Sequence, residues 1–81
     1  MMNKPEKLVS AKNIAAILNV SPATVNYYTN IGLFKARGRK GNVRLYDEEE
    51  TTGIFEQIRH LRGEGYSLRL IQQRFEKGYS V

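Results

Sequence analysis

The fold of this chain is decided by residues 20–33, which read Val-Ser-Pro-Ala-Thr-Val-Asn-Tyr-Tyr-Thr-Asn-Ile-Gly-Leu. Ser21 can accept a hydrogen bond from an unpaired amide of a first helical turn, and Pro22 then takes the first helical position, where its missing N–H costs nothing. Gly32 stands where a residue in the left-handed conformation would close that helix. The segment therefore predicts a helix of about ten residues with both ends defined.

The predicted helix has two different faces. One carries apolar or aromatic side chains at a spacing of three and predicts contact with the core; it consists of Val25, Tyr28 and Ile31. The other has no acidic residue and consists of Ala23, Asn26, Tyr27 and Asn30. This second face is therefore left for solvent or for a partner.

Another helix is predicted just before this one. Leu8 begins a short extended piece that ends at Ser10, a residue suited to capping a helix. A helix from Ala11 to Leu18 follows, with the i, i+3, i+4 pattern of an amphipathic helix on Ile14, Ala15, Ile17 and Leu18. Residues 19–21 then connect the two helices. Two short helices joined in this way form a helix-turn-helix with the second helix in the recognition position.

The character of the sequence changes after Gly32. Residues 33–46 form two half-alternating runs around a basic, glycine-rich segment, which predicts a β hairpin with a basic tip. Four cations with no acidic residue among them gather there, namely Arg37, Arg39, Lys40 and Arg44. Positive φ is tolerated at Gly38, Gly41 and Asn42, which lets the backbone approach an anion closely. The concentration of charge favours a binding role over an ordinary solvated loop.

Two further helices are predicted in the second half of the chain. Asp47 is suited to N-cap the third helix and Glu50 to complete a capping box, which explains this acidic run better than a pair of catalytic carboxylates. The third helix continues to about Arg62, with an apolar face of Ile54, Phe55, Ile58 and Leu61. Ser67 caps the last helix, which ends at Gly78 and whose apolar face is Leu68, Ile71 and Phe75.

The length of 81 residues allows one small domain without a deep catalytic cavity. The chain has no cysteine and one histidine, so we expect no metal, no cofactor and no enzymatic activity. No apolar run approaches the ~20 residues of a membrane span, and the N-terminus is polar rather than a signal peptide. We expect a cytoplasmic protein with a flexible leader (residues 1–7), one domain (residues 8–78) and a tail (residues 79–81).

The positive charge is unevenly distributed along the chain. Residues 1–46 hold eight Lys or Arg against one Glu, a balance of +7, whereas residues 47–81 hold five against seven acidic residues, a balance of −2. A basic half predicts a polyanionic partner, either nucleic acid or an anionic membrane surface. A membrane binder would need a basic amphipathic helix with exposed large apolar residues, whereas this charge gathers in a glycine-rich hairpin. Nucleic acid is therefore the favoured partner.

Three segments in a fixed order resemble one family. They are residues 20–28 with 31–33, residues 43–47 (Val-Arg-Leu-Tyr-Asp), and residues 58–62 followed by 65–68 and Ile71. This set is similar to the DNA-binding domain of MerR-family transcriptional regulators, over about residues 8–75. The resemblance implies a mainly α-helical winged helix-turn-helix, with four short helices and a small β-hairpin wing. The second helix would enter the major groove and the wing would lie along the DNA backbone or the minor groove.

The resemblance also implies which residues bind DNA. Three residues match the exposed start of the family's recognition helix, namely Ser21, Ala23 and Thr24. Tyr27 matches a family tyrosine whose hydroxyl reaches a phosphate, and Tyr28 matches the neighbouring residue that packs inward. In the wing, Arg44 matches the arginine of the family's Gly-Tyr-Arg-x-Tyr pattern, and Tyr46 matches its last tyrosine. Additional positive charge is supplied by Arg37, Arg39 and Lys40.

This sequence departs from the family pattern at three positions. Asn26 stands where the family usually has arginine, which replaces a guanine or phosphate contact with a side chain suited to adenine. Val43 replaces the usual wing tyrosine, and Thr29 replaces the usual acidic residue. Family members typically dimerise through a long helix after the fourth one, so a dimer is expected only if a further C-terminal helix exists in the full protein.

The leading hypothesis is sequence-dependent binding of double-stranded DNA by a transcriptional regulator, or its isolated DNA-binding domain, in the bacterial nucleoid. RNA polymerase at a promoter is a further expected partner, and no membrane contact is expected. A small excisionase-like architectural protein, which uses a similar winged helix without an effector domain, is the first alternative. A basic module that docks an acidic protein is the second.

Overall fold

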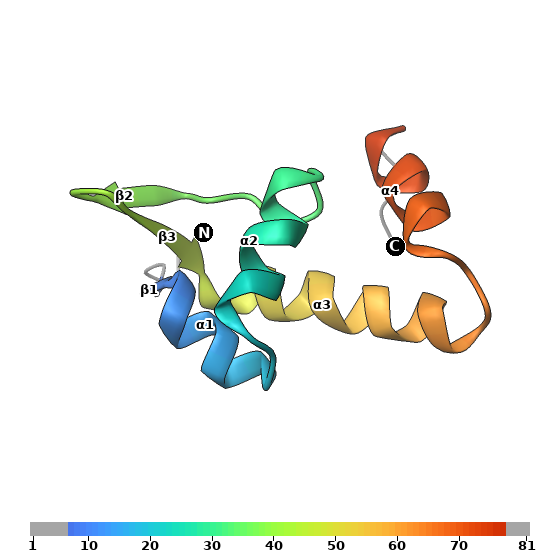
Figure 1. The fold of residues 1–81 in the computed structure, drawn as a ribbon, viewed down its shortest axis with the longest axis horizontal. Helices are drawn as coiled ribbons and strands as arrows, with labels where there is room; N and C mark the ends of the chain where they lie inside the picture. The colour runs from blue at the N-terminus through green and yellow to red at the C-terminus, as the bar shows by residue number, and fades with distance from the viewer. Residues whose placement is uncertain (1–6, 78–81) are drawn as a thin grey trace, which may run out of the picture.

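A computed structural model of the protein describes residues 7–77 as four helices and a three-stranded antiparallel sheet (Figure 1). The elements in chain order are β1 (Leu8–Ser10), α1 (Ala11–Leu18), α2 (Pro22–Asn30), β2 (Gly38–Lys40), β3 (Val43–Asp47), α3 (Glu48–Gly63) and α4 (Leu68–Glu76). The predicted fold class, a mainly helical winged helix-turn-helix, is confirmed. The predicted helix end at Gly78, the tail, and residues 1–6 of the predicted leader lie outside the described residues.

The helix-turn-helix has the predicted bounds because its capping signals are local. The Ser10 hydroxyl accepts a hydrogen bond from the amide of Asn13 (3.2 Å), and the Ser21 hydroxyl accepts one from the amide of Thr24 (3.1 Å). Asn19 closes α1 in the left-handed conformation at φ 63°, and Gly32 follows α2 at φ 89°. Both helices are therefore fixed at each end by residues within three positions of the helix.

The two faces of α2 are also as predicted. Val25 is fully buried, and Tyr28 and Ile31 pack against the core, whereas the other face, made of Ala23, Asn26, Tyr27 and Asn30, is exposed. In α1 the prediction for Ile17 is wrong, because its side chain is 46% exposed. At roughly 100° per residue, Ile17 lies about 110° from the centre of the buried stripe of this helix. That stripe consists of Ile14, Ala15 and Leu18.

The sheet has the order β1-β3-β2, with both pairs antiparallel. The sequence predicts the extended piece at Leu8 but not its pairing, in which Leu8 lies opposite Asp47 and Ser10 lies opposite Leu45. Ser10 is thus both the end of β1 and the N-cap of α1. The start of the helix-turn-helix is therefore attached directly to the hairpin.

The hairpin itself is shorter than predicted. Leu33 and Phe34 are buried in the core rather than paired in a strand, and their amides both donate to the carbonyl of Tyr28. Of the three residues predicted to tolerate positive φ, only Gly41 adopts it, at 63°. Gly38 instead lies in β2, where a Cβ would come within 3.3 Å of the Leu8 side chain.

The two helices in the second half of the chain have the predicted N-caps, with one difference at Glu50. Asp47 Oδ1 accepts a hydrogen bond from the amide of Glu50 (2.7 Å), and Ser67 Oγ accepts one from the amide of Leu70 (3.2 Å). The Glu50 carboxylate, however, accepts two hydrogen bonds from Arg37, so the reciprocal half of the predicted capping box is wrong.

The last helix is tied to the recognition helix. The Gln72 side-chain amide of α4 donates to the carbonyl of Ile31, just after α2, at 3.1 Å. Ile71 of α4 is fully buried in the same core as Val25 of α2. In Figure 1, α4 stands at the end of α3 that is far from the hairpin. The core side of α2 is therefore covered, while its polar face is left open.

Gly53 lies inside α3, where a Cβ would meet no atom within 4 Å. Replacing Gly53 with alanine should raise the free energy of unfolding by about 0.5–1 kcal/mol, because alanine restricts the unfolded chain and favours the helix. Urea denaturation followed by circular dichroism measures this change. Gly65→Ala is the matched control and should have the opposite sign, because Gly65 has φ 101°. A loss of stability in Gly53→Ala would contradict the open surroundings of this residue.

Candidate nucleic-acid interface

The recognition helix and the hairpin form two walls of one groove. Its lining comes from α2, from the hairpin and from the first residue of α1, and consists of Ala11, Asn26, Asn30, Asn42, Val43 and Arg44. We call this the α2–hairpin groove. It contains a guanidinium group and three side-chain amides but no carboxylate. The two elements that the sequence predicts to bind DNA are thus adjacent.

The first turn of α2 is held by hydrogen bonds of the Ser21 side chain. Besides capping the helix, the Ser21 hydroxyl lies 3.0 Å from the hydroxyl of Thr24. Ala23 is exposed beside them, and Tyr27, one turn later, is 53% exposed. Small and polar side chains at this end of a helix let the backbone approach a DNA groove closely.

The cations of the hairpin fall into two groups. Arg39 and Lys40 are exposed on β2, and Arg39 lies directly opposite the half-buried Arg44 of β3. Like charges directly opposite each other across two strands are destabilising. The Arg39–Arg44 pair therefore costs stability in the isolated protein, and an anion beside it would relieve that cost.

Arg37 belongs to the second group because it has a partner within the protein. Its Nε donates to Glu50 Oε1 at 2.9 Å, and its terminal nitrogen donates to Glu50 Oε2. This pair of bonds joins the chain before β2 to the first turn of α3. The side chain thus anchors the base of the hairpin, in addition to any charge that it offers to a partner.

The match to known families agrees with this geometry. Residues 9–78 match the family described as MerR HTH family regulatory protein. The chain belongs to this family. MerR-type regulators are DNA-binding proteins with a helix-turn-helix, so DNA binding and regulation of transcription are supported for this chain in general terms. Comparison with curated proteins and with solved structures gave no match.

One residue that the sequence predicts to bind DNA, Tyr46, is buried in the structure. Tyr46 is 0% exposed, so it cannot contact DNA, and its assignment as a DNA-binding residue is wrong. Its hydroxyl lies 2.7 Å from the hydroxyl of Thr29, which in turn donates to the carbonyl of Val25 at 2.8 Å. Because the single hydroxyl hydrogen of Thr29 goes to Val25, Tyr46 is the donor to Thr29. Tyr46 therefore joins β3 to α2 from the core side.

Two polar residues of the groove are missing from the set predicted for this MerR-type domain. Asn30 lies one turn after Asn26 on the same exposed face of α2, and Asn42 lies in the turn between β2 and β3. The i, i+4 spacing of Asn26 and Asn30 was the available signal for the first. No signal in the sequence places Asn42 opposite α2, because that depends on the angle of the hairpin.

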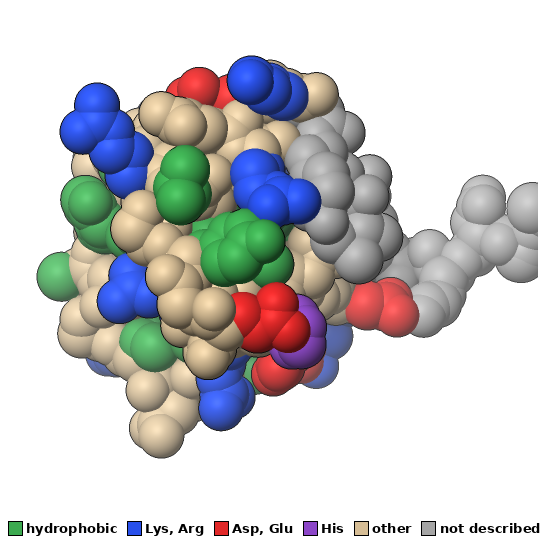
Figure 2. Space-filling view, turned by 90° about the vertical axis from the view of Figure 1, so that its right-hand side faces the viewer, with side chains coloured by type: hydrophobic (Ala, Val, Ile, Leu, Met, Phe, Trp, Pro, Cys, Tyr) green, Lys and Arg blue, Asp and Glu red, His purple; other side chains and the backbone are tan. Residues whose placement is uncertain are grey.

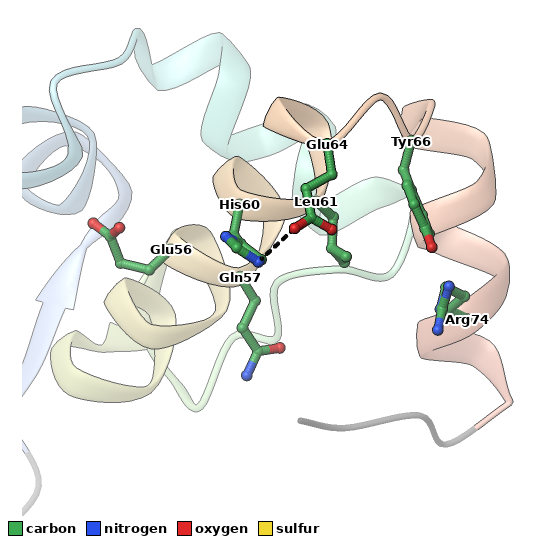
Figure 3. Close-up of a pocket in the computed structure, with 7 residues that line it drawn as sticks. All are labelled: Glu56, Gln57, His60, Leu61, Glu64, Tyr66 and Arg74. Carbon is green, nitrogen blue, oxygen red and sulfur yellow. Dashed lines mark ion pairs between the residues drawn. The ribbon is translucent and has the colours of Figure 1, made fainter.

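A second groove lies between α3 and α4 (Figure 3). It is lined by Glu56, Gln57, His60, Leu61, Glu64, Tyr66 and Arg74. His60 Nε2 lies 3.2 Å from Glu64 Oε2, and the Arg74 guanidinium lies 5.2 Å from the centre of the Tyr66 ring. Figure 2 shows this end of the molecule, where acidic side chains lie next to the histidine and Lys and Arg side chains lie elsewhere on the same face. These carboxylates make the groove a poor site for a phosphate backbone.

Neither a metal cluster nor a membrane span marks an additional site in the part of the chain that the structure describes. Over residues 7–77, no three His, Cys, Asp or Glu side chains come together in a way that could hold a metal ion. Over the same residues, no helix is both long enough and apolar enough to cross a bilayer. The α2–hairpin groove is therefore the candidate functional site of the described residues.

Tyr46→Phe should lower the free energy of unfolding by about 1 kcal/mol, because it removes one buried hydrogen bond without changing the ring. Urea denaturation at neutral pH measures the change. Tyr27→Phe is the matched control: this exposed hydroxyl should contribute less than about 0.5 kcal/mol. Equal stabilities for the Tyr46 variant and the wild type would show that the Tyr46–Thr29 bond does not hold the two elements together.

Proposed function

We propose that this chain binds double-stranded DNA in a sequence-dependent way as a MerR-type regulator of transcription, with α2 in the major groove and the hairpin on the backbone. The observation that carries the proposal is the α2–hairpin groove, in which an exposed polar helix face meets a basic hairpin without an acidic side chain. A helix-turn-helix places the N-terminal residues of its second helix against base edges. The exposed start of α2 at Ala23 fits this position.

The residues divide between base contacts and phosphate contacts. Asn26, exposed in the second turn of α2, is suited to a bidentate contact with the edge of adenine. Phosphates are held by the cations of the hairpin and by the hydroxyl groups near the start of α2; these residues are Arg39, Lys40, Arg44, Ser21, Thr24 and Tyr27, with Arg37 acting mainly through Glu50. Phosphate contacts supply most of the affinity and make it dependent on salt.

The wider setting follows from the same proposal. A regulator of this type acts in the bacterial cytoplasm on the nucleoid and meets RNA polymerase at a promoter. The polar side chains that line the groove are three amides and one guanidinium group, which can bind base edges and phosphates directly, so the proposal includes no metal or cofactor. Dimerisation would require a further helix after α4.

Arg44→Ala should weaken binding to selected and random duplexes by similar factors. It should also reduce the dependence of log K on log salt concentration by about 0.9, because one phosphate contact is lost. Fluorescence anisotropy with labelled duplexes at several salt concentrations measures both quantities. Arg62→Ala, which removes an exposed arginine at the end of α3, is the control and should leave the salt dependence close to that of the wild type.

Asn26→Ala should reduce the preference for a selected duplex over a random one by about tenfold, since a bidentate base contact discriminates by about 1–3 kcal/mol. The selected duplex comes from a random pool bound by the wild type, and the same anisotropy assay gives the ratio of the two affinities. Equal losses on both duplexes would exclude a base-reading role for Asn26. If the wild type bound no duplex at low salt, the proposed function itself would be wrong.

A further inference from the structure

The α2–hairpin groove contains two amides whose role is not explained by base reading. Asn30 is the last residue of α2, and Asn42 belongs to the hairpin turn. Both side chains are exposed, and both line the groove together with the half-buried Arg44. A recognition helix approaches the bases with its N-terminal end, so a residue at its C-terminal end lies nearer the backbone. The position of Asn30 therefore favours a phosphate over a base edge.

The charges of the hairpin also favour a phosphate as the ligand of the two amides. Arg44 lies directly opposite Arg39 across the two strands. Two positive groups therefore lie together where β3 pairs with the short strand β2. No carboxylate lines the groove beside Arg44. A side-chain amide can donate to a phosphate oxygen without adding to the repulsion between the two arginines. Asn30 and Asn42 thus add donors at a place where further cations would be costly.

We infer that Asn30, Asn42 and Arg44 together bind one phosphate of a single DNA strand that passes between α2 and the hairpin. The inference rests on the proposed function and adds two residues to it. Arg44 supplies the charge, and the two amides, one from each wall, fix the position of the strand between the walls. The contact made by the amides is independent of sequence, in contrast to that of Asn26. It is also insensitive to salt, because a neutral donor releases no counterion.

The test places a neutral methylphosphonate at each backbone position of a selected duplex in turn and measures binding by fluorescence anisotropy. In the wild type, the phosphate in the groove should stand out by a loss of roughly three- to tenfold. Asn30→Ala, Asn42→Ala and Arg44→Ala should each bind the unmodified duplex more weakly. Their sensitivity at that same position should fall in part for the two asparagine variants, which keep the charge of Arg44, and should fall most for Arg44→Ala. Gln73→Ala, which removes an exposed amide from α4, is the matched control and should keep the wild-type profile.

Salt dependence separates the amides from the arginine. Asn30→Ala and Asn42→Ala should keep the wild-type slope of log K against log salt concentration, whereas Arg44→Ala should reduce it by about 0.9. Asn30→Asp and Asn42→Asp should weaken binding more than the alanine variants, because each puts a carboxylate beside the phosphate. Circular dichroism verifies that the four asparagine variants are folded.

Three results would overturn the inference. The alanine variants could bind as the wild type does, their sensitivities could map to different phosphates, or Asn30→Ala could lose affinity only for the selected duplex, as a base-reading residue would. In each of these cases the wild type still binds DNA, and the proposed function stands. Failure of the wild type to bind any duplex at low salt would instead overturn the proposed function and the inference together.

Discussion

The hydroxyl group of Tyr46 joins β3 of the hairpin to α2, and the α2–hairpin groove depends on this contact. Tyr46 is fully buried, and its hydrogen bond to Thr29 continues to the carbonyl of Val25. A buried hydroxyl without a partner would cost about 1–3 kcal/mol, so the ring can occupy the core only when α2 and β3 lie at this distance. The angle between the two walls of the α2–hairpin groove thus depends on the contact between Tyr46 and Thr29, which lies on the core side of both elements.

A second contact acts at the base of the hairpin. The bonds from Arg37 to Glu50 join the chain before β2 to α3, and β1 pairs with the other side of β3. An exposed ion pair contributes at most about 1 kcal/mol, so its value lies in geometry rather than in stability. Between these attachments, Arg39 and Arg44 remain directly opposite each other. The hairpin therefore tolerates repulsion at its centre because it is held on both sides, and the repelling charges are those that the proposed function assigns to phosphates.

The accuracy of the sequence-based predictions follows the range of the interactions involved. Caps such as those of Ser21 and Asp47 depend on residues three positions apart, so helix starts and ends could be predicted from the sequence alone. The orientation of Tyr46 depends on Thr29, seventeen positions away, and no local pattern contains it. The family resemblance assigned this tyrosine to the DNA-binding residues, whereas its side chain is buried in the core.

The other differences from the sequence-based predictions also arise from contacts between elements. Ile17 fits an apolar pattern but lies beside the buried stripe, because α1 is too short for its pattern to distinguish the two sides. The pairing of β1 with β3 joins residues at the start of the predicted domain to residues near its middle, which periodicity does not report. The presence of Asn30 and Asn42 in one groove requires the hairpin to lie beside α2. Elements were thus predictable from the sequence, while contacts between elements were not.

The position of the positive charge gives the proposed interaction a preferred face. Residues 33–46, which include the hairpin, hold five Lys or Arg and no acidic residue. The α3–α4 groove, with Glu56 and Glu64 in its lining, lies toward the end of α3 that is far from the hairpin (Figure 1). Electrostatic interactions in solution are screened over about 10 Å at 0.1 M salt, so these two carboxylates oppose the approach of the hairpin to DNA only weakly. A chain with a modest net charge of +5 can in this way present DNA with a locally much more positive surface.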